Sequence, residues 1–111
     1  MALLTALAAC AGEPLAADPV DGIYHGTSRR YRADSRACPS PGLIVLRVVN
    51  GSFQYRWGDR TVIDATIAPG GAIAGARGAI NLSGRLAQGR IEGDVSNEPC
   101  AYHFRAVRRA Q

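Results

Sequence analysis

The dipeptide Asn50-Gly51 constrains the fold more than any other feature, because both residues readily adopt the positive φ angles of a type I′ turn. Apolar and polar residues alternate on both sides of it, which predicts a β-hairpin over residues 43–57. A two-residue loop sets the register and gathers apolar side chains on one face. The expected pairs on that face are Val48 with Phe53, Leu46 with Tyr55, and Ile44 with Trp57. The other face is mixed and pairs Val45 with Arg56, Arg47 with Gln54, and Val49 with Ser52.

The same alternation continues along the chain, and no helical periodicity follows Asp21. A second hairpin is expected over residues 80–96, turning at Gln88-Gly89, with Gly84 opposite Gly93. Facing glycines let a sheet bend or let another backbone come close. Further alternating segments cover residues 22–29, 61–68, 72–77 and 100–108. We therefore expect an all-β domain of about eight short antiparallel strands, a meander closed into a small barrel or half-open sandwich.

The N-terminal segment Leu7-Ala8-Ala9-Cys10 resembles the lipobox of bacterial lipoproteins, whose cysteine is diacylated. The resemblance implies a signal and lipobox segment over residues 1–10, a tether over 11–21 and a β-domain over 22–109. It also implies an exported, periplasmic protein, and Ala11-Gly12 after the cysteine imply an outer-membrane lipoprotein. An accidental match stays open as the alternative, because only nine residues precede Cys10 and none is Arg or Lys.

The other two cysteines, Cys38 and Cys100, are left as a pair if Cys10 carries lipid, and exported proteins favour disulfides. A bridge between them would close a loop of about 60 residues and stabilise the fold by about 4 kcal/mol. A metal site or a redox pair is the alternative, but no Cys-X-X-Cys spacing or histidine pair accompanies them. Residues 31–42 surround Cys38 and lack alternation, so we expect a long loop there.

The formal net charge is +4, and all 13 basic residues are arginines. They are distributed along the chain without an RNA-binding aromatic motif, which argues against a nucleic-acid partner. One cluster interleaves an aromatic ring with guanidinium groups and is a candidate surface for an acidic partner. It consists of Arg29, Arg30, Tyr31 and Arg32. The alternative interpretation is a solvated basic loop.

Residue types that carry catalysis are present but do not form a recognisable constellation. His25 and His103 alternate with inward aromatic residues and are expected to face solvent. If the first and last strands pair, the two histidines would approach one another, and a metal or proton-transfer role becomes conceivable. An acid–base pair among the outward carboxylates is the other option; these are Asp59, Asp64, Glu92 and Asp94. Serine elbows and phosphate loops are missing, so we predict no catalytic residue, cofactor or metal.

Three short patterns resemble small secreted or lipid-anchored β-domains of proteobacteria over about residues 21–108. They are Asp-Gly-Ile-Tyr-His-Gly at 21–26, the glycine-rich run at 84–94, and Cys-X-Tyr-X-Phe at 100–104. The resemblance implies fold and compartment but no activity, since the function of that family is unknown. The architecture is also similar to periplasmic barrels that inhibit lysozymes or proteases, although no inhibitory loop motif is present.

Together these features predict a monomeric, non-catalytic envelope domain that binds a partner protein or an envelope polymer. An inhibitor of a hydrolase and a small-ligand carrier are the rival hypotheses. The carrier is disfavoured because aromatic side chains are expected to fill so small a barrel.

Overall fold

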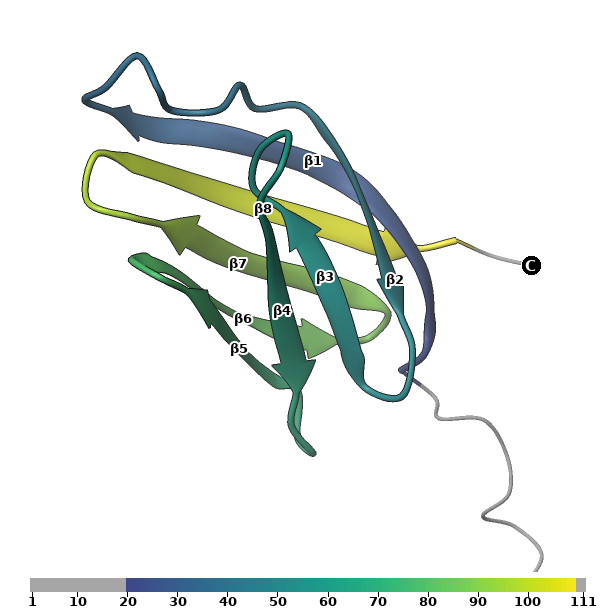
Figure 1. Ribbon diagram of the computed structural model, residues 1–111. Coiled ribbons are helices and arrows are strands. Elements are labelled where there is room, and N and C mark those ends of the chain that lie inside the picture. Colours follow the sequence, from purple (N-terminus) through teal and green to yellow (C-terminus); the bar gives the residue numbers. More distant parts are fainter. Residues whose placement is uncertain (1–19, 110–111) are drawn as a thin grey trace, which may run out of the picture.

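The computed structural model describes residues 20–109, which form one eight-stranded antiparallel sheet (Figure 1). The strands are β1 (Gly22–Ala33), β2 (Leu43–Val48), β3 (Ser52–Arg56), β4 (Val62–Ile67), β5 (Ala72–Arg77), β6 (Ile80–Ala87), β7 (Arg90–Ser96) and β8 (Cys100–Arg108). Within this range there is no helix long and apolar enough to cross a membrane.

The strand order is β2-β1-β8-β7-β6-β5-β4-β3, so β3 to β8 form a meander and β8 then pairs with β1. In Figure 1 the sheet curls until β2 and β3, its two ends, lie side by side across from β8 and β7. Only an isolated bridge between Val49 and Ser52 joins those two ends. The molecule is a nearly closed barrel, which confirms the predicted fold class.

The barrel interior is filled by the side chains that alternation assigned to it. Tyr55 on β3 and Phe104 on β8 come from opposite walls, with ring centroids 5.0 Å apart. Tyr24, Ile63, Ile91, Val95 and Phe104 are fully buried, and Leu46, Val48, Phe53, Tyr55, Ile73, Leu82, Tyr102 and Ala106 nearly so. Each large apolar side chain removed from water contributes about 1.5–3 kcal/mol, so this packed interior is the main stabilising element.

The first predicted hairpin forms its turn but not its ladder. Asn50 and Gly51 have φ angles of 53° and 76°, as a type I′ turn requires. Beyond the Val49–Ser52 bridge, however, β2 pairs with β1 and β3 pairs with β4. Five of the six expected cross-strand pairs are therefore wrong, and only Val49 with Ser52 is confirmed. The wrong pairs are Val48 with Phe53, Leu46 with Tyr55, Ile44 with Trp57, Val45 with Arg56, and Arg47 with Gln54.

The physical reason is that each strand has a second partner that sets its direction. Leu46 lies opposite Tyr24, and Tyr55 lies opposite Ile63, so each strand follows the twist of its own neighbour and the two diverge. The expected facing is nevertheless correct, because it depends on alternation alone.

The start of β1 is fastened to the same turn by a carboxylate. Asp21 accepts hydrogen bonds from the backbone N–H groups of Asn50, at 2.8 Å, and Gly51, at 3.1 Å. These amides lie at the tip of the turn, where they have no partner in a strand ladder. The carboxylate therefore anchors the point from which β2 and β3 diverge.

The second predicted hairpin is confirmed in register and turn. Gly84 lies opposite Gly93, and Gln88 and Gly89 have φ angles of 53° and 74°. Gly93 also faces Phe104 on β8. A Cβ atom on Gly93 would lie 3.0 Å from Phe104 Cζ and 2.3 Å from the Ser83 carbonyl oxygen. The absent side chain leaves room for the Phe104 ring beside the strand.

Gly93→Ala is expected to destabilise the protein by about 1–3 kcal/mol, because the added methyl group overpacks against Phe104 and a backbone oxygen. Urea unfolding followed by Tyr and Trp fluorescence measures the change. Ser83→Ala, on the exposed face of the neighbouring strand, should change stability by no more than about 0.5 kcal/mol. Equal effects of the two substitutions would contradict this role of Gly93.

The disulfide joins Cys38 and Cys100, whose Cα atoms are 5.5 Å apart, over a sequence separation of 62 residues. It pins the loop over residues 34–42 to the start of β8. The expected start of this loop at Tyr31 is wrong, because β1 continues to Ala33. β8 is long enough to pair with Arg32 and Ala33 beyond a bulge at Tyr31.

Replacing both cysteines by serine should lower the free energy of unfolding by about 4 kcal/mol, since the closed loop no longer restricts the unfolded chain. Equilibrium unfolding in urea, compared with the oxidised protein, measures this loss. A difference below about 1 kcal/mol would show that the loop is held by its other contacts instead.

Candidate binding cleft

The seam between β2 and β3 is a wedge that is bonded at its narrow end and open at the other (Figure 1). The Ser28 N–H on β1 donates to the carbonyl oxygen of Gly42, the residue before β2, at 2.7 Å, which sets the alternation of the β1–β2 ladder. Ile44, Leu46 and Val48 consequently bond to β1, whereas Val45 and Arg47 direct their N–H and C=O groups into the seam.

The other wall of the seam, β3, also directs backbone groups into it. The Trp57 N–H donates to the Thr61 carbonyl oxygen at 2.9 Å, so alternate residues of β3 bond to β4. Gln54 and Arg56 therefore direct their backbone groups toward β2. Apart from the Val49–Ser52 bridge, no strand pairing in the described part of the chain spans the seam.

A cleft of about 980 Å³ occupies the wide end of the wedge. It lies among β2, β3, the β3–β4 turn and the loop over residues 34–42. Its lining combines proline, aliphatic and aromatic side chains with polar ones such as Arg56, Asp59 and Thr61. The main members are Pro39, Pro41, Leu43, Ile44, Trp57 and Tyr102. Leu43, at the rim, is 88 % exposed.

The loop wall of this cleft is held in place by several contacts on one proline. The Tyr102 hydroxyl donates to the Pro39 carbonyl oxygen, and the Arg30 guanidinium donates to the same oxygen at 3.2 Å. Burial raises the pKa of Tyr102, and Arg30 partly offsets that effect. The Trp57 ring meets the Tyr102 ring edge to face, with centroids 5.2 Å apart. With the adjacent disulfide, these contacts make the cleft a preformed feature.

Tyr55 lies at the floor of the cleft and is only 4 % exposed. Burial raises its pKa from the ordinary value of 10.0 to about 12, while a hydrogen bond with Ser28 lowers it slightly. The neutral phenol is therefore the form that the folded state favours.

The unfolded chain releases the Tyr55 proton near pH 10, and the folded protein retains it to about pH 12. Tyr55 therefore contributes about 3 kcal/mol to the free energy of unfolding below pH 10. This contribution is lost as the pH rises from 10 to 12. Urea unfolding at a series of pH values measures the slope. Tyr55→Phe should flatten it, and an unchanged slope in that variant would contradict the assignment.

The predicted arginine cluster does not form one surface. Arg30 is engaged at the cleft, and Arg32 donates from Nε to the Glu98 carbonyl oxygen at 3.0 Å and from Nη2 to that of Asn97 at 2.8 Å. Arg29 lies opposite His103 on the outer face of the barrel. Tyr31, 59 % exposed, also lies there. Two of the four residues thus brace neighbouring loops, and partner binding by this cluster stays a prediction.

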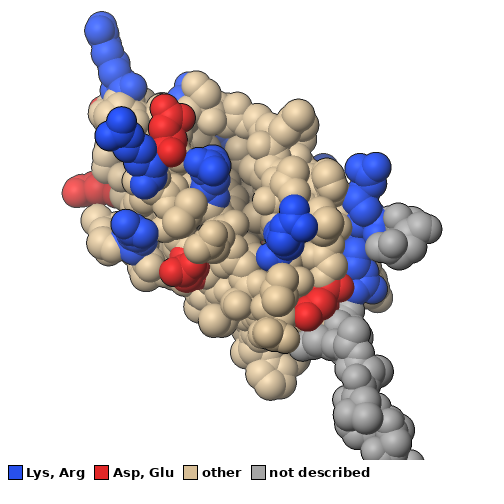
Figure 2. Space-filling view, turned by 45° about the vertical axis from the view of Figure 1, so that its right-hand side comes forward, with Lys and Arg blue, Asp and Glu red and all other residues tan. Residues whose placement is uncertain are grey.

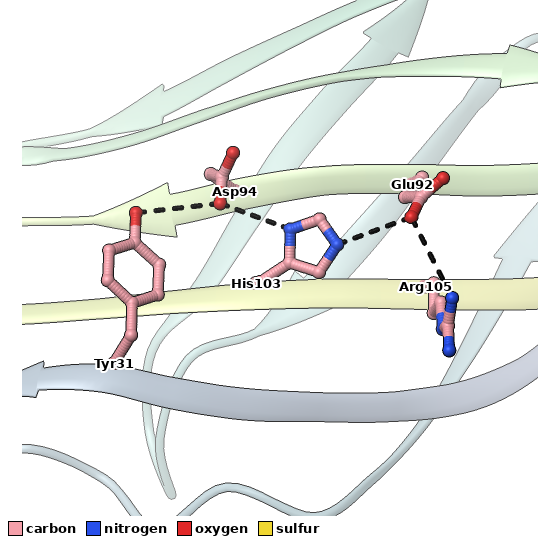
Figure 3. Close-up of polar contacts among 5 residues, drawn as sticks. All are labelled: Tyr31, Glu92, Asp94, His103 and Arg105. Carbon is pink, nitrogen blue, oxygen red and sulfur yellow. Dashed lines mark hydrogen bonds and ion pairs between the residues drawn. The ribbon is translucent and has the colours of Figure 1, made fainter.

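A polar ladder crosses the outer face of β1, β8 and β7 (Figure 3). His103 lies between two carboxylates, with Nδ1 3.3 Å from Asp94 Oδ1 and Nε2 3.3 Å from Glu92 Oε2. The Tyr31 hydroxyl donates to Asp94 at 3.5 Å, and Arg105 lies 4.0 Å from Glu92. Alternation indicated that His103, Glu92 and Asp94 face solvent but not that they form one network with Tyr31 and Arg105. Such contacts on an open surface connect neighbouring strands and contribute little each.

The two histidines are not brought together. β1 and β8 do pair, but His25 lies opposite Val107 and His103 lies opposite Arg29. The rungs are four residues apart, which is about 13 Å along a strand. Over residues 20–109, no group of three or more His, Cys, Asp or Glu side chains is arranged to hold a metal ion.

Charge is dispersed over the face of the molecule that Figure 2 shows. Figure 2 shows basic and acidic side chains interspersed on one face around a broad uncharged area. This view offers no continuous basic patch of the kind that nucleic acid requires.

Cys10, the predicted lipid-bearing residue, and the lipobox around it lie outside the described residues.

Comparisons with known protein families, with curated proteins and with solved structures find no match for this chain. The function of this chain is therefore inferred from the geometry of its structure. The cleft is the feature that the sequence analysis missed. Its signals were present in Cys38-Pro39-Ser40-Pro41 and the exposed Leu43, but only the sheet order places them beside Trp57.

Proposed function

We propose that this chain is a non-catalytic binding domain of the bacterial cell envelope, and that it takes an extended polypeptide segment of a partner protein into the cleft between β2 and β3. The observation that carries the proposal is the preformed cleft of about 980 Å³ at an incompletely paired seam. Its volume is at the upper end of the range typical of ligand sites.

The proposed compartment is supported by two features. The Cys38–Cys100 disulfide is typical of proteins from oxidising environments. The lipobox resemblance at Cys10 supports attachment to a membrane, with the barrel held away from it by the tether at residues 11–21. An outer-membrane lipoprotein is the form we propose.

A polypeptide suits this cleft better than a small ligand or a polysaccharide. The aromatic side chains fill the barrel interior, so a small molecule would lie in an open groove instead of an enclosed cavity. The walls offer proline and aliphatic surface together with unpaired strand edges, which are the groups that extended peptides contact. The arginines near the cleft are already engaged with backbone oxygens, which leaves less charge for an anionic polymer.

The only tryptophan of the chain, Trp57, lines the cleft and reports its occupancy. We expect reduced, carboxymethylated ribonuclease A, an unfolded polypeptide without tryptophan, to shift Trp57 emission to the blue. Leu43→Asp at the rim should weaken binding by about tenfold or more, because a buried leucine contributes about 1.5–3 kcal/mol. Ala74→Asp, on the exposed outer face of β5, is the matched control and should leave binding within about twofold of the parent.

A second titration uses peptidoglycan solubilised by lysozyme. A response to the polypeptide that depends on Leu43 supports the proposal. Response to peptidoglycan alone, or response to neither probe, overturns it.

A further inference from the structure

The seam is hollowed on both faces of the barrel wall. The cleft opens on the inner side along Leu43–Leu46. A second hollow of about 580 Å³ opens on the outer side, along Val45, Arg47 and Val49 of β2 and Ser52 and Gln54 of β3. The seam-facing edge of β2 therefore has space both toward the barrel interior and toward the outer surface. This is also where its backbone groups are not paired across the seam.

This arrangement matches the requirements of a β-strand. The side chains of a strand alternate between two faces, and its backbone presents donors and acceptors at each edge. A strand beside β2 would direct alternate side chains into the inner cleft and the outer hollow. Its amides would meet the seam-facing groups of Val45 and Arg47. Other classes of occupant supply either groups for both hollows or backbone donors and acceptors for the edge, but not both.

The two hollows differ in chemistry. The inner one offers aliphatic, proline and aromatic side chains, including Ile44 and Trp57, beside some polar ones. The outer one presents Arg47, which forms no ion pair with any residue in 20–109. Asp64, the acidic residue there, is held by the side-chain amide of Gln54 at 3.1 Å. An occupant with apolar residues inward and acidic residues outward would complement both.

We propose that the partner segment binds by antiparallel strand addition to the free edge of β2, and that it alternates apolar and acidic residues. This inference rests on the proposed function and specifies how the partner is recognised. A second copy of the chain is a poorer occupant, because it would bring another Arg47 and another net charge of +4 to the same seam.

The probe is a capped octapeptide of alternating valine and glutamate, titrated into the oxidised full chain and followed by Trp57 emission. We expect it to bind about tenfold more tightly than the matching valine–lysine peptide, because carboxylates meet Arg47. Arg47→Glu should reverse this preference. Size-exclusion chromatography at the same concentrations records the oligomeric state.

Backbone pairing is tested from both sides of the contact. In an antiparallel strand beside β2, the outward glutamates are the residues whose amides bond to Val45 and Arg47. N-methylation of the glutamate amides should therefore weaken binding by about tenfold or more, whereas N-methylation of the valine amides should not. In the protein, Val45→Pro removes a seam-facing N–H without breaking the β1–β2 ladder. It should weaken binding similarly, while Val45→Thr should not.

The outcomes separate this inference from the proposed function. If unfolded ribonuclease A binds at the cleft but the octapeptides show neither charge preference nor N-methyl sensitivity, strand addition is overturned and the binding function stands. If none of the polypeptide probes binds, both fail. A dimer that forms through the seam and excludes the octapeptide would also overturn the inference. The N-methyl pair keeps the test decisive even if Val45→Pro fails to fold.

Discussion

The antiparallel pairing of β1 with β8 is the contact on which the rest of this structure depends. It joins the two ends of the described chain from Tyr24 opposite Arg108 to Ala33 opposite Cys100. Without it, residues 52–108 would form a meander with edges at β3 and β8, and the antiparallel pair of β1 and β2 would have no place in the sheet. With it, Tyr24 and Phe104 enter the same core, and Cys38 reaches Cys100.

The same pairing also decides where the barrel stays open. β2 takes its direction from β1, and β3 takes its direction from β4, so the two strands diverge from the Asn50-Gly51 turn as the sheet twists. Proteins normally protect strand edges, because unpaired backbone groups invite association. Here the two edges face one another across the wedge and are joined only at the Val49–Ser52 bridge.

Rigidity around the wedge gives the binding proposal its physical basis. The disulfide, the Tyr102 hydroxyl and the Arg30 guanidinium hold the loop over residues 34–42, so the cleft does not have to be organised when a partner arrives. Preorganisation of this kind reduces the ordering cost of association. The polar ladder around His103 lies on the open outer face and lacks such enclosure. The cleft is therefore the stronger candidate for a functional surface.

Local pattern by itself indicated most of the strand residues, which side chains face inward and where the Asn50-Gly51 and Gln88-Gly89 turns fall, and it made Cys38 and Cys100 the expected pair. These properties follow from alternation, turn chemistry and cysteine number, which are local or simple to count. The partners of β2 and β3 were decided only by the tertiary structure. The hairpin around Asn50-Gly51 has the strongest local signal, yet it became the seam, because β1 and β4 bond to the opposite edges of β2 and β3 and draw the two strands in different directions. The cleft and the outer hollow are consequences of that divergence, which no single segment of the sequence determines. The lipid anchor at Cys10 remains a prediction from its motif.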